Sequence, residues 1–227
     1  AAGIVILEGY GLTEGTAACS VNLPSAYRFG TVGHVLPGIE ARLAGDGELL
    51  IRGDTVFSGY LDDPAATAAA IDAEGWLHTG DIAALDADGF LSITDRKKDI
   101  LVTASGKNVA PQNIENELKA QPGISQALVV GDRRPYIVAL LTLTEPGVDR
   151  DSAAAQQVAA AAVERVNAGL ARHEQVKRFA VLPGDFTQEA GEVTPTLKLR
   201  RRVVEQNNAA RIEELYTGHP GPCTALR

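Results

Sequence analysis

The sequence is poor in sulfur: it has no methionine and only two cysteines, Cys19 and Cys223. The cysteines are far apart and belong to no Cys-x-x-Cys motif or Cys/His cluster. This pattern argues against a zinc site or a disulfide framework, and we expect two reduced thiols. Because methionine is absent and the chain starts directly in an apolar run, Ala1 is not expected to be a natural N-terminus, and the sequence is interpreted as a fragment.

Long apolar runs are also missing. No stretch approaches the roughly 20 apolar residues that a membrane-spanning helix needs, and no secretion signal opens the sequence. A cytoplasmic protein is therefore expected. The formal net charge of −8 argues against nucleic acid as a partner, because phosphate backbones are bound by a surplus of lysine and arginine. With 45% hydrophobic and 22% charged residues, the 227-residue chain is long enough for one large or two smaller cores.

The first half of the sequence predicts short strands separated by glycine turns. The strands are expected at residues 4–7, 39–43, 48–51 and 90–94. One helix interrupts them, because Asp63 is a good N-cap, Pro64 suits the first helical position, and alanines follow.

The second half alternates helices and strands. Pro111 opens a helix with Ile114 and Leu118 on one face, followed by strands at residues 124–130 and 136–143. The remaining expected elements are a long helix with Val158, Ala162, Val166 and Leu170 on one stripe, a strand at 179–182, and a last helix carrying Val204, Ile212, Leu215 and Tyr216. The pattern changes between Asp95 and Leu101, which predicts domains at residues 1–97 and 98–227, with a flexible tail at 218–227.

Three short segments carry groups suited to nucleotide chemistry. Gly9-Tyr10-Gly11-Leu12-Thr13-Glu14 follows an expected strand, so its glycines would let the chain turn and present a hydroxyl and a carboxylate. A hard carboxylate such as Glu14 suits Mg²⁺ beside phosphates. Taken alone, a glycine turn ending in a solvated Glu14 is the more ordinary interpretation.

The second segment is Trp76-Leu77-His78-Thr79-Gly80-Asp81, whose Asp81 can accept hydrogen bonds from both hydroxyls of a ribose. Loop aspartates more often stabilise their own turns. The third segment is the charge run Asp95-Arg96-Lys97-Lys98-Asp99 at the expected domain boundary. Such a run is usually a solvated face.

In their order and spacing, these segments resemble the adenylate-forming superfamily of acyl-CoA synthetases, luciferases and peptide-synthetase adenylation domains. The resemblance continues through Thr103-Ala104-Ser105-Gly106-Lys107-Asn108-Val109-Ala110-Pro111 and Thr194-Pro195-Thr196-Leu197-Lys198-Leu199-Arg200-Arg201, and is greatest for bacterial long-chain fatty acid–CoA ligases. It implies an α+β fold in which residues 1–97 form the strand-rich C-terminal part of the large AMP-binding domain and residues 98–227 form a small mobile lid.

The resemblance also implies roles for individual residues, with ATP, Mg²⁺ and coenzyme A as cofactors and a fatty acid as substrate. Three residues would act in catalysis: Lys198, Glu14 and Thr13, with Glu14 as the metal ligand. The nucleotide would be bound by Tyr10, Gly11, Thr13, Asp81, Arg96 and Lys198. Lys98 would be the hinge, and Gly106 would border the channel for the pantetheine arm of CoA. His78, Lys97 and Lys107 receive no role.

Two features set this sequence apart from the full family pattern. Gly15 replaces a residue that more often carries a hydroxyl, and no Ser/Thr/Gly-rich loop with a lysine, the triphosphate cradle of the family, occurs. The chain alone is therefore expected to lack a complete active site. A fatty acyl-AMP ligase that passes its acyl group to a carrier protein, and a catalytically idle nucleotide- or partner-binding domain, are the alternative functions.

The cluster Arg200–Arg202 opens the expected last helix, where the helix dipole disfavours cations by a few tenths to ~1 kcal/mol each. A solvated surface is one interpretation of this cluster. A patch for CoA phosphates or for an anionic membrane surface, which would make the protein peripheral to the membrane, is the other.

Overall fold

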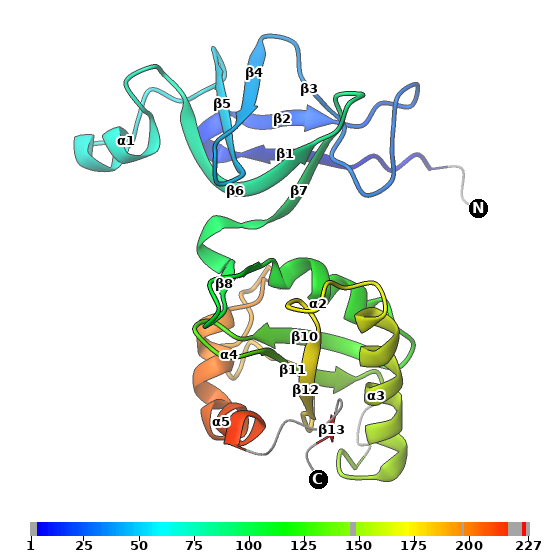
Figure 1. Ribbon diagram of the computed structural model, residues 1–227. Helices are drawn as coiled ribbons and strands as arrows, with labels where there is room; N and C mark the ends of the chain where they lie inside the picture. Colours follow the sequence, from blue (N-terminus) through cyan, green and yellow to red (C-terminus); the bar gives the residue numbers. More distant parts are fainter. Residues whose placement is uncertain (1–3, 146–148, 197, 218–223, 226–227) are drawn as a thin grey trace. The chain divides into compact units, whose positions relative to one another are not determined.

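The computed structural model describes residues 4–145, 149–196, 198–217 and 224–225. It is an α+β protein, as predicted, and divides into two compact units, unit 1 (residues 1–99) and unit 2 (residues 100–227) (Figure 1). The assignment of residues 1–97 and 98–227 to a large-domain remnant and a mobile lid stays a prediction. Among the described residues, no helix combines the length and apolar character needed to cross a membrane.

Unit 1 contains two antiparallel sheets, one ordered β1-β2-β3 and one ordered β4-β5-β6-β7. The strands are β1 (Gly9–Leu12), β2 (Ala17–Val21), β3 (His34–Val35), β4 (Ile39–Leu43), β5 (Glu48–Gly53), β6 (Leu77–Leu85) and β7 (Leu91–Arg96). Apolar side chains from both sheets share one core, formed by Cys19, Leu49, Ile51, Leu77, Ala83 and Leu91. Cys19 is a buried free thiol, as expected, and Cys223 lies outside the described residues.

The expected helix after Asp63 is confirmed as α1 (Pro64–Ala70), and the Asp63 side chain accepts a hydrogen bond from the Ala66 N–H at 2.8 Å. The expected strand at residues 4–7 is wrong. Ile4, Val5 and Ile6 are 76%, 70% and 87% exposed, and no strand pairs with them in the described part of the chain. The chain becomes a strand only at β1, because β2 is there to accept its backbone hydrogen bonds.

Unit 2 is built on a four-stranded sheet ordered β10-β11-β12-β13, in which β10 and β11 are antiparallel and the other neighbours are parallel. A short hairpin of β8 and β9 precedes it. The strands are β8 (Leu101–Val102), β9 (Asn108–Val109), β10 (Ile124–Val130), β11 (Ile137–Leu143), β12 (Val176–Val181) and β13 (Thr224–Ala225). Apart from β13, the residues of the expected flexible tail lie outside the described part of the chain.

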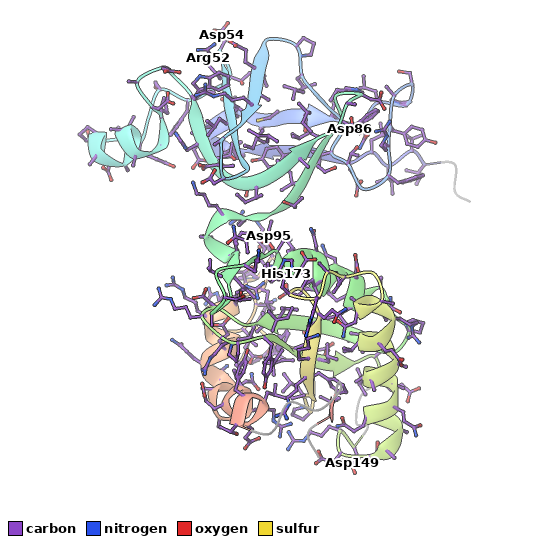
Figure 2. The ribbon with its side chains drawn as sticks, viewed as in Figure 1. Arg52, Asp54, Asp86, Asp95, Asp149 and His173 are labelled. Atoms are coloured by element: carbon purple, nitrogen blue, oxygen red, sulfur yellow. The ribbon has the colours of Figure 1, made fainter. Side chains whose placement is uncertain are left out.

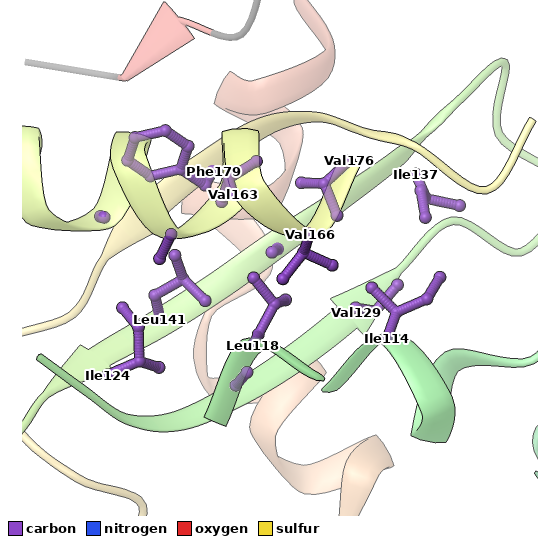
Figure 3. Packing of buried hydrophobic residues seen from close by; sticks show 14 of the residues in the cluster. Ile114, Leu118, Ile124, Val129, Ile137, Leu141, Val163, Val166, Val176 and Phe179 are labelled. Atoms are coloured by element: carbon purple, nitrogen blue, oxygen red, sulfur yellow. The ribbon is translucent and has the colours of Figure 1, made fainter. Parts of the chain in front are cut away.

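Helices cover both faces of this sheet, and alternate side chains of β11 therefore enter two different cores. Ile137, Ala139 and Leu141 pack under α2 (Pro111–Lys119) and α3 (Ala153–Asn167), a cluster shown in Figure 3. Val138 and Leu140 pack under α4 (Arg201–Asn207) and α5 (Ala209–Thr217). The two pairs of helices thus enclose the sheet on both sides, which explains the almost continuous apolar sequence of β11.

Two details of the predicted helices are wrong. The buried stripe of α3 is Ala155, Ala159, Ala162, Val163 and Val166, whereas Val158 is 38% exposed and the helix ends before Leu170. The expected last helix is two helices, α4 and α5, which meet at Asn208. The break lets Val204, Ile212 and Leu215 reach the same core from two directions.

The basic cluster at the start of α4 is only partly solvated. Arg201 binds the buried Glu115 carboxylate at 2.9 Å and donates to the Val129 carbonyl at 2.8 Å, whereas Arg200 and Arg202 are exposed. The ion pair and the carbonyl contact offset the unfavourable position of Arg201 near a helix N-terminus.

The packing of α3 can be tested with one substitution at two positions. Val163 is fully buried, so Val163→Ala is expected to lower the free energy of unfolding by about 2 kcal/mol. Val158→Ala, on the same helix, is the matched control and is expected to change it by less than about 0.5 kcal/mol. Urea denaturation followed by circular dichroism measures both; equal losses would contradict this packing.

Candidate nucleotide site in unit 1

Three of the predicted nucleotide-binding residues lie together in unit 1. The Tyr10 hydroxyl donates a hydrogen bond to Asp81 Oδ2 at 2.5 Å, and Arg96 Nε lies 3.7 Å from Asp81 Oδ1. Tyr10 comes from β1, whereas Asp81 and Arg96 are register partners on β6 and β7. The sheet therefore places one carboxylate between a hydroxyl and a guanidinium.

Gly80 and Thr79 shape the backbone just before Asp81. Gly80 has a φ of +72°, a left-handed conformation that glycine adopts without steric cost. The Thr79 hydroxyl donates to the Leu49 carbonyl at 2.7 Å and accepts from the Asp81 N–H at 3.2 Å. The Asp81 side chain is only 14% exposed. A carboxylate has about four acceptor positions, so Asp81 retains capacity for ribose hydroxyls beside its two protein partners.

Burial raises the pKa of the Tyr10 hydroxyl well above its ordinary value, and the hydrogen bond to Asp81 raises it further. Tyr10 therefore remains a neutral donor to Asp81 at neutral pH. The contact makes Tyr10 a support for the carboxylate. The predicted contact of Tyr10 with the nucleotide stays a prediction.

Glu14 lies in a tight 3-10 turn, Thr13–Gly15, directly after β1. Its Oε1 accepts a hydrogen bond from the Tyr60 hydroxyl at 2.8 Å, and its carbonyl accepts from the Phe57 N–H at 2.8 Å. Thr13 is exposed. Sequence reasoning missed Tyr60, because no local pattern connects it with a residue 46 positions away.

Close packing of β1 against β2 requires glycine at position 11, in the first motif. A side chain at Gly11 would place its Cβ 1.7 Å from the Ala17 carbonyl oxygen, so β1 and β2 can pair at their bulge only with glycine there. The motif was expected to be a turn after a strand. Its first four residues are instead the strand β1, and only Thr13 and Glu14 lie in the turn that follows. Thr16 and Ala17 leave this turn with left-handed φ values of 54° and 79°.

Glu14 is the predicted magnesium ligand, and this role stays a prediction. No cluster of three or more His, Cys, Asp or Glu side chains able to hold a metal exists among the described residues. Mg²⁺ beside phosphates typically takes one or two carboxylates and completes its coordination with phosphate oxygens and water. One carboxylate oxygen of Glu14 accepts the hydrogen bond from Tyr60, and the second oxygen is available to a metal ion.

A network centred on Glu48 adjoins the Asp81 segment. The Glu48 side chain accepts hydrogen bonds from the Gly80 N–H, from His78 and from the Lys97 ammonium. Burial alone would raise the pKa of Glu48, but these donors outweigh it and the pKa is lowered. Hydrogen bonds to Asp46 and Glu48 raise the pKa of Lys97. His78 and Lys97, for which no role was predicted, thus share one partner.

The remaining predicted residues occupy turns. Lys98 lies in the 3-10 turn Lys97–Asp99 that ends unit 1. In unit 2, Gly106 has a φ of +76° in the turn that connects β8 and β9, closed by a hydrogen bond from the Thr103 N–H to the Lys107 carbonyl at 2.9 Å. This positive φ is a sufficient reason for glycine at that position.

Lys198 is exposed and follows Leu197, which lies outside the described residues. Its N–H donates to the Thr194 hydroxyl at 3.0 Å, and its carbonyl accepts from the Thr194 N–H at 2.8 Å. A bridge between Val193 and Leu199 closes the base of this turn. The lysine therefore stands on a turn that holds its backbone and leaves its ammonium in solvent.

Residues 98–220 match the AMP-binding enzyme C-terminal domain, and residues 1–61 match the AMP-binding enzyme family. The chain belongs to the AMP-binding enzymes, the adenylate-forming superfamily that its sequence resembles, and corresponds to their C-terminal portion.

Among curated relatives, the chain is 44% identical over 232 residues to the long-chain-fatty-acid–CoA ligase FadD15 of Mycobacterium tuberculosis, covering 95% of this chain and 38% of that protein. It is 35% identical over 252 residues to the long-chain-fatty-acid–CoA ligase ACSBG1 of Homo sapiens, covering 94% and 35%. The chain thus spans less than two fifths of the length of each of these relatives.

Solved structures agree with the fold. The ATP-bound MatB of Rhodopseudomonas palustris aligns with a TM-score of 0.71 at 26% identity, covering 91% of this chain and 41% of that chain. The o-succinylbenzoate coenzyme A synthetase MenE of Bacillus subtilis, in complex with AMP, aligns with a TM-score of 0.69 at 26% identity, covering 86% and 40%.

The raised pKa of Tyr10 gives a spectroscopic prediction. In urea all five tyrosines ionise near pH 10, so Tyr10→Phe should remove about one fifth of the tyrosinate absorbance gained between about pH 8 and 11. In the native chain the variant should show no such loss, because Tyr10 stays protonated. A smaller absorbance gain in the variant than in the wild type under native conditions would contradict the Tyr10–Asp81 contact.

The raised pKa of Tyr10 also makes the free energy of unfolding depend on pH in the alkaline range. The folded-state pKa of Tyr10 lies above its unfolded value of about 10, so its stabilising contribution is complete below that pH and is lost as the pH rises through the folded-state value. Tyr10→Phe should therefore reduce the alkaline dependence of the free energy of unfolding.

Proposed function

We propose that the chain is the C-terminal portion of a long-chain fatty acid–CoA ligase, which uses ATP to activate a fatty acid and transfers the acyl group to coenzyme A. The observation that carries this proposal is the 44% identity to FadD15, which extends over 95% of the chain. The grouping of Tyr10, Asp81 and Arg96 supports it, because these contacts create a site suited to a ribose.

In the first half-reaction, an oxygen of the fatty carboxylate attacks the α-phosphorus of ATP, and the bond to the bridging oxygen of the β-phosphate breaks to release pyrophosphate. Asp81 and Arg96 would bind the ribose, and Thr13 would donate to the α-phosphate. Glu14 would hold Mg²⁺, which neutralises phosphate charge when bound. Lys198 would bring its ammonium to the attacking carboxylate, because two anions must meet in this step.

In the second half-reaction, the sulfur of CoA attacks the acyl carbonyl carbon, the thiol gives up its proton, and the bond to the AMP oxygen breaks. We propose that residues 98–227 turn about Lys98 between the two steps, so that Lys198 leaves and the turn of Gly106 borders the pantetheine arm. Gly106, which is favoured by its positive φ, would place no side chain in such a narrow channel.

The 227 residues alone are not expected to make acyl-adenylate, since the lysine-containing loop that cradles the triphosphate in this family does not occur in their sequence. Activity should therefore be measured on a full-length enzyme.

We also propose that the enzyme is cytoplasmic and contacts membranes peripherally through Arg200 and Arg202, because both side chains are exposed.

Lys198→Ala in the full-length enzyme tests the proposal by separating the half-reactions. Fatty-acid-dependent pyrophosphate exchange should fall on the order of 10²- to 10³-fold, the usual effect of removing one charge-stabilising donor. Conversion of supplied acyl-AMP and CoA to acyl-CoA should remain within about threefold, because Lys198 would no longer be at the reacting atoms.

Lys119→Ala is the matched control, since Lys119 is an exposed lysine near the end of α2. It should leave both half-reactions unchanged. Near-normal pyrophosphate exchange by Lys198→Ala would remove Lys198 from the catalytic residues. If the wild-type enzyme formed acyl-AMP but no thioester with free CoA, the fatty acyl-AMP ligase alternative would replace the proposal, and no pyrophosphate exchange at all would favour a binding domain.

A further inference from the structure

The side chain of Glu48 is among the few buried carboxylates described in unit 1, with 5% of its side chain exposed. Its Oε1 accepts from the Gly80 N–H at 3.0 Å, and its Oε2 lies 2.9 Å from Lys97 Nζ and 3.1 Å from His78 Nδ1. Burying a charge is costly unless it is paired and hydrogen-bonded. These three contacts meet that requirement.

On one side, this network holds the backbone next to Asp81, whose carboxylate is proposed to bind the ribose. Gly80 immediately precedes Asp81, and its N–H is fixed by Glu48, while His78 two residues earlier binds the same carboxylate. The position of the backbone just before Asp81 therefore depends on Glu48. A shift there would move the Asp81 carboxylate away from Tyr10 and Arg96.

The other side of the network holds the entry to the proposed hinge. Lys97 follows Arg96 and opens the 3-10 turn Lys97–Asp99, and its ammonium is bound by Glu48 and, at 2.7 Å, by the more exposed Asp46. Lys98, the next residue, is exposed, and its side chain has no hydrogen bond or ion pair within the part of the chain that the structure describes.

We propose that Glu48 and Lys97 form a hinge anchor. Glu48 is a positioning residue that links the segment of Asp81, the proposed ribose-binding carboxylate, to Lys97, the residue just before the proposed hinge Lys98. The inference rests on the proposed function. The ion pair holds the backbone up to Lys97 to the sheet of unit 1, and the change in dihedral angles is confined to Lys98 and the residues after it. The lid then turns about a point with a defined position relative to the bound ribose.

The anchor is present throughout the catalytic cycle. The lowered pKa of Glu48 and the raised pKa of Lys97 keep both groups charged at neutral pH. The Glu48 contribution is complete above the ordinary pKa of a glutamate and is lost only as the pH falls through the lower folded-state value. The ion pair is thus a fixed support and not a switch near neutral pH.

The experiment uses the full-length enzyme with Lys97→Met, which keeps the aliphatic stem and removes the charge, and Glu48→Gln, which keeps an acceptor for the Gly80 N–H. Both variants should slow conversion of acyl-AMP and CoA to acyl-CoA by about tenfold, within the range of mutations that disturb a conformational equilibrium. The KM for ATP in pyrophosphate exchange should stay within about twofold, because Asp81 remains supported.

Glu48→Ala removes both functions of the carboxylate, so it should slow the thioester step and also raise the KM for ATP about tenfold. Lys97→Arg should restore the thioester step to within about twofold of wild type, which a merely space-filling role would not require. The double variant Glu48→Gln/Lys97→Met should be no slower than either single variant, because both remove the same ion pair.

Glu40→Gln is the control, since it breaks the ion pair of Glu40 with Arg52, also 2.7 Å long but with a Glu40 side chain 61% exposed. It should leave both half-reactions unchanged. Equal loss of both half-reactions in Lys97→Met, no loss in either, or no restoration by Lys97→Arg would each overturn the anchor. These results differ from failure of the proposed function, in which the wild-type enzyme itself would form no acyl-CoA.

Discussion

The antiparallel register of β6 and β7 is the constraint on which unit 1 depends. It places Asp81 directly opposite Arg96, and the shared core of the two sheets brings the Tyr10 hydroxyl to the same carboxylate. Because the period of a strand is two residues, a shift of one position would turn these side chains to the opposite face. The same strand end leads through Lys97 into the 3-10 turn, so the register also decides where the chain leaves the sheet. Figure 2 shows Asp95 beside this exit, where its carboxylate accepts the Arg96 N–H at 2.7 Å.

Unit 2 contains Lys198, the proposed catalytic lysine, which is exposed on a hydrogen-bonded turn. Its sheet is enclosed by helices on both faces, which gives the unit two apolar cores. The turn of Lys198 lies just before α4, whose first residue Arg201 is bound to Glu115 of α2 and to the Val129 carbonyl. Breaking a buried ion pair by removing one partner costs roughly 3–5 kcal/mol, so this contact secures the segment that presents the lysine. The ammonium itself remains free to reach an anion.

Local chemistry made part of this structure predictable. Asp63 and Pro64 predicted α1, Pro111 predicted α2, and the apolar run of β11 predicted a buried strand. Each of these signals acts within a few residues of its element. The strand at residues 4–7 was wrong because apolar composition cannot supply a neighbouring strand. The partners of Glu14, Glu48 and Arg201 could not be found, since Tyr60, Lys97 and Glu115 lie 46, 49 and 86 positions away in the sequence. The family motifs named Tyr10, Asp81 and Arg96, and only the fold shows that Tyr10 and Arg96 both contact Asp81.

We propose that Asp81, held by Tyr10, Arg96 and the Glu48 network, accepts the ribose hydroxyls of ATP. The most direct measurement compares kcat/KM of the full-length enzyme for ATP and for 2′,3′-dideoxy-ATP, in the wild type and in Asp81→Ala. Hydrogen bonds to a charged acceptor contribute about 1.5–3 kcal/mol each, so the wild type should prefer ATP on the order of 10²-fold or more. In Asp81→Ala this preference should fall to about threefold or less, mainly through loss of activity with ATP. An unchanged preference in the variant would show that the ribose hydroxyls are bound elsewhere and not by Asp81.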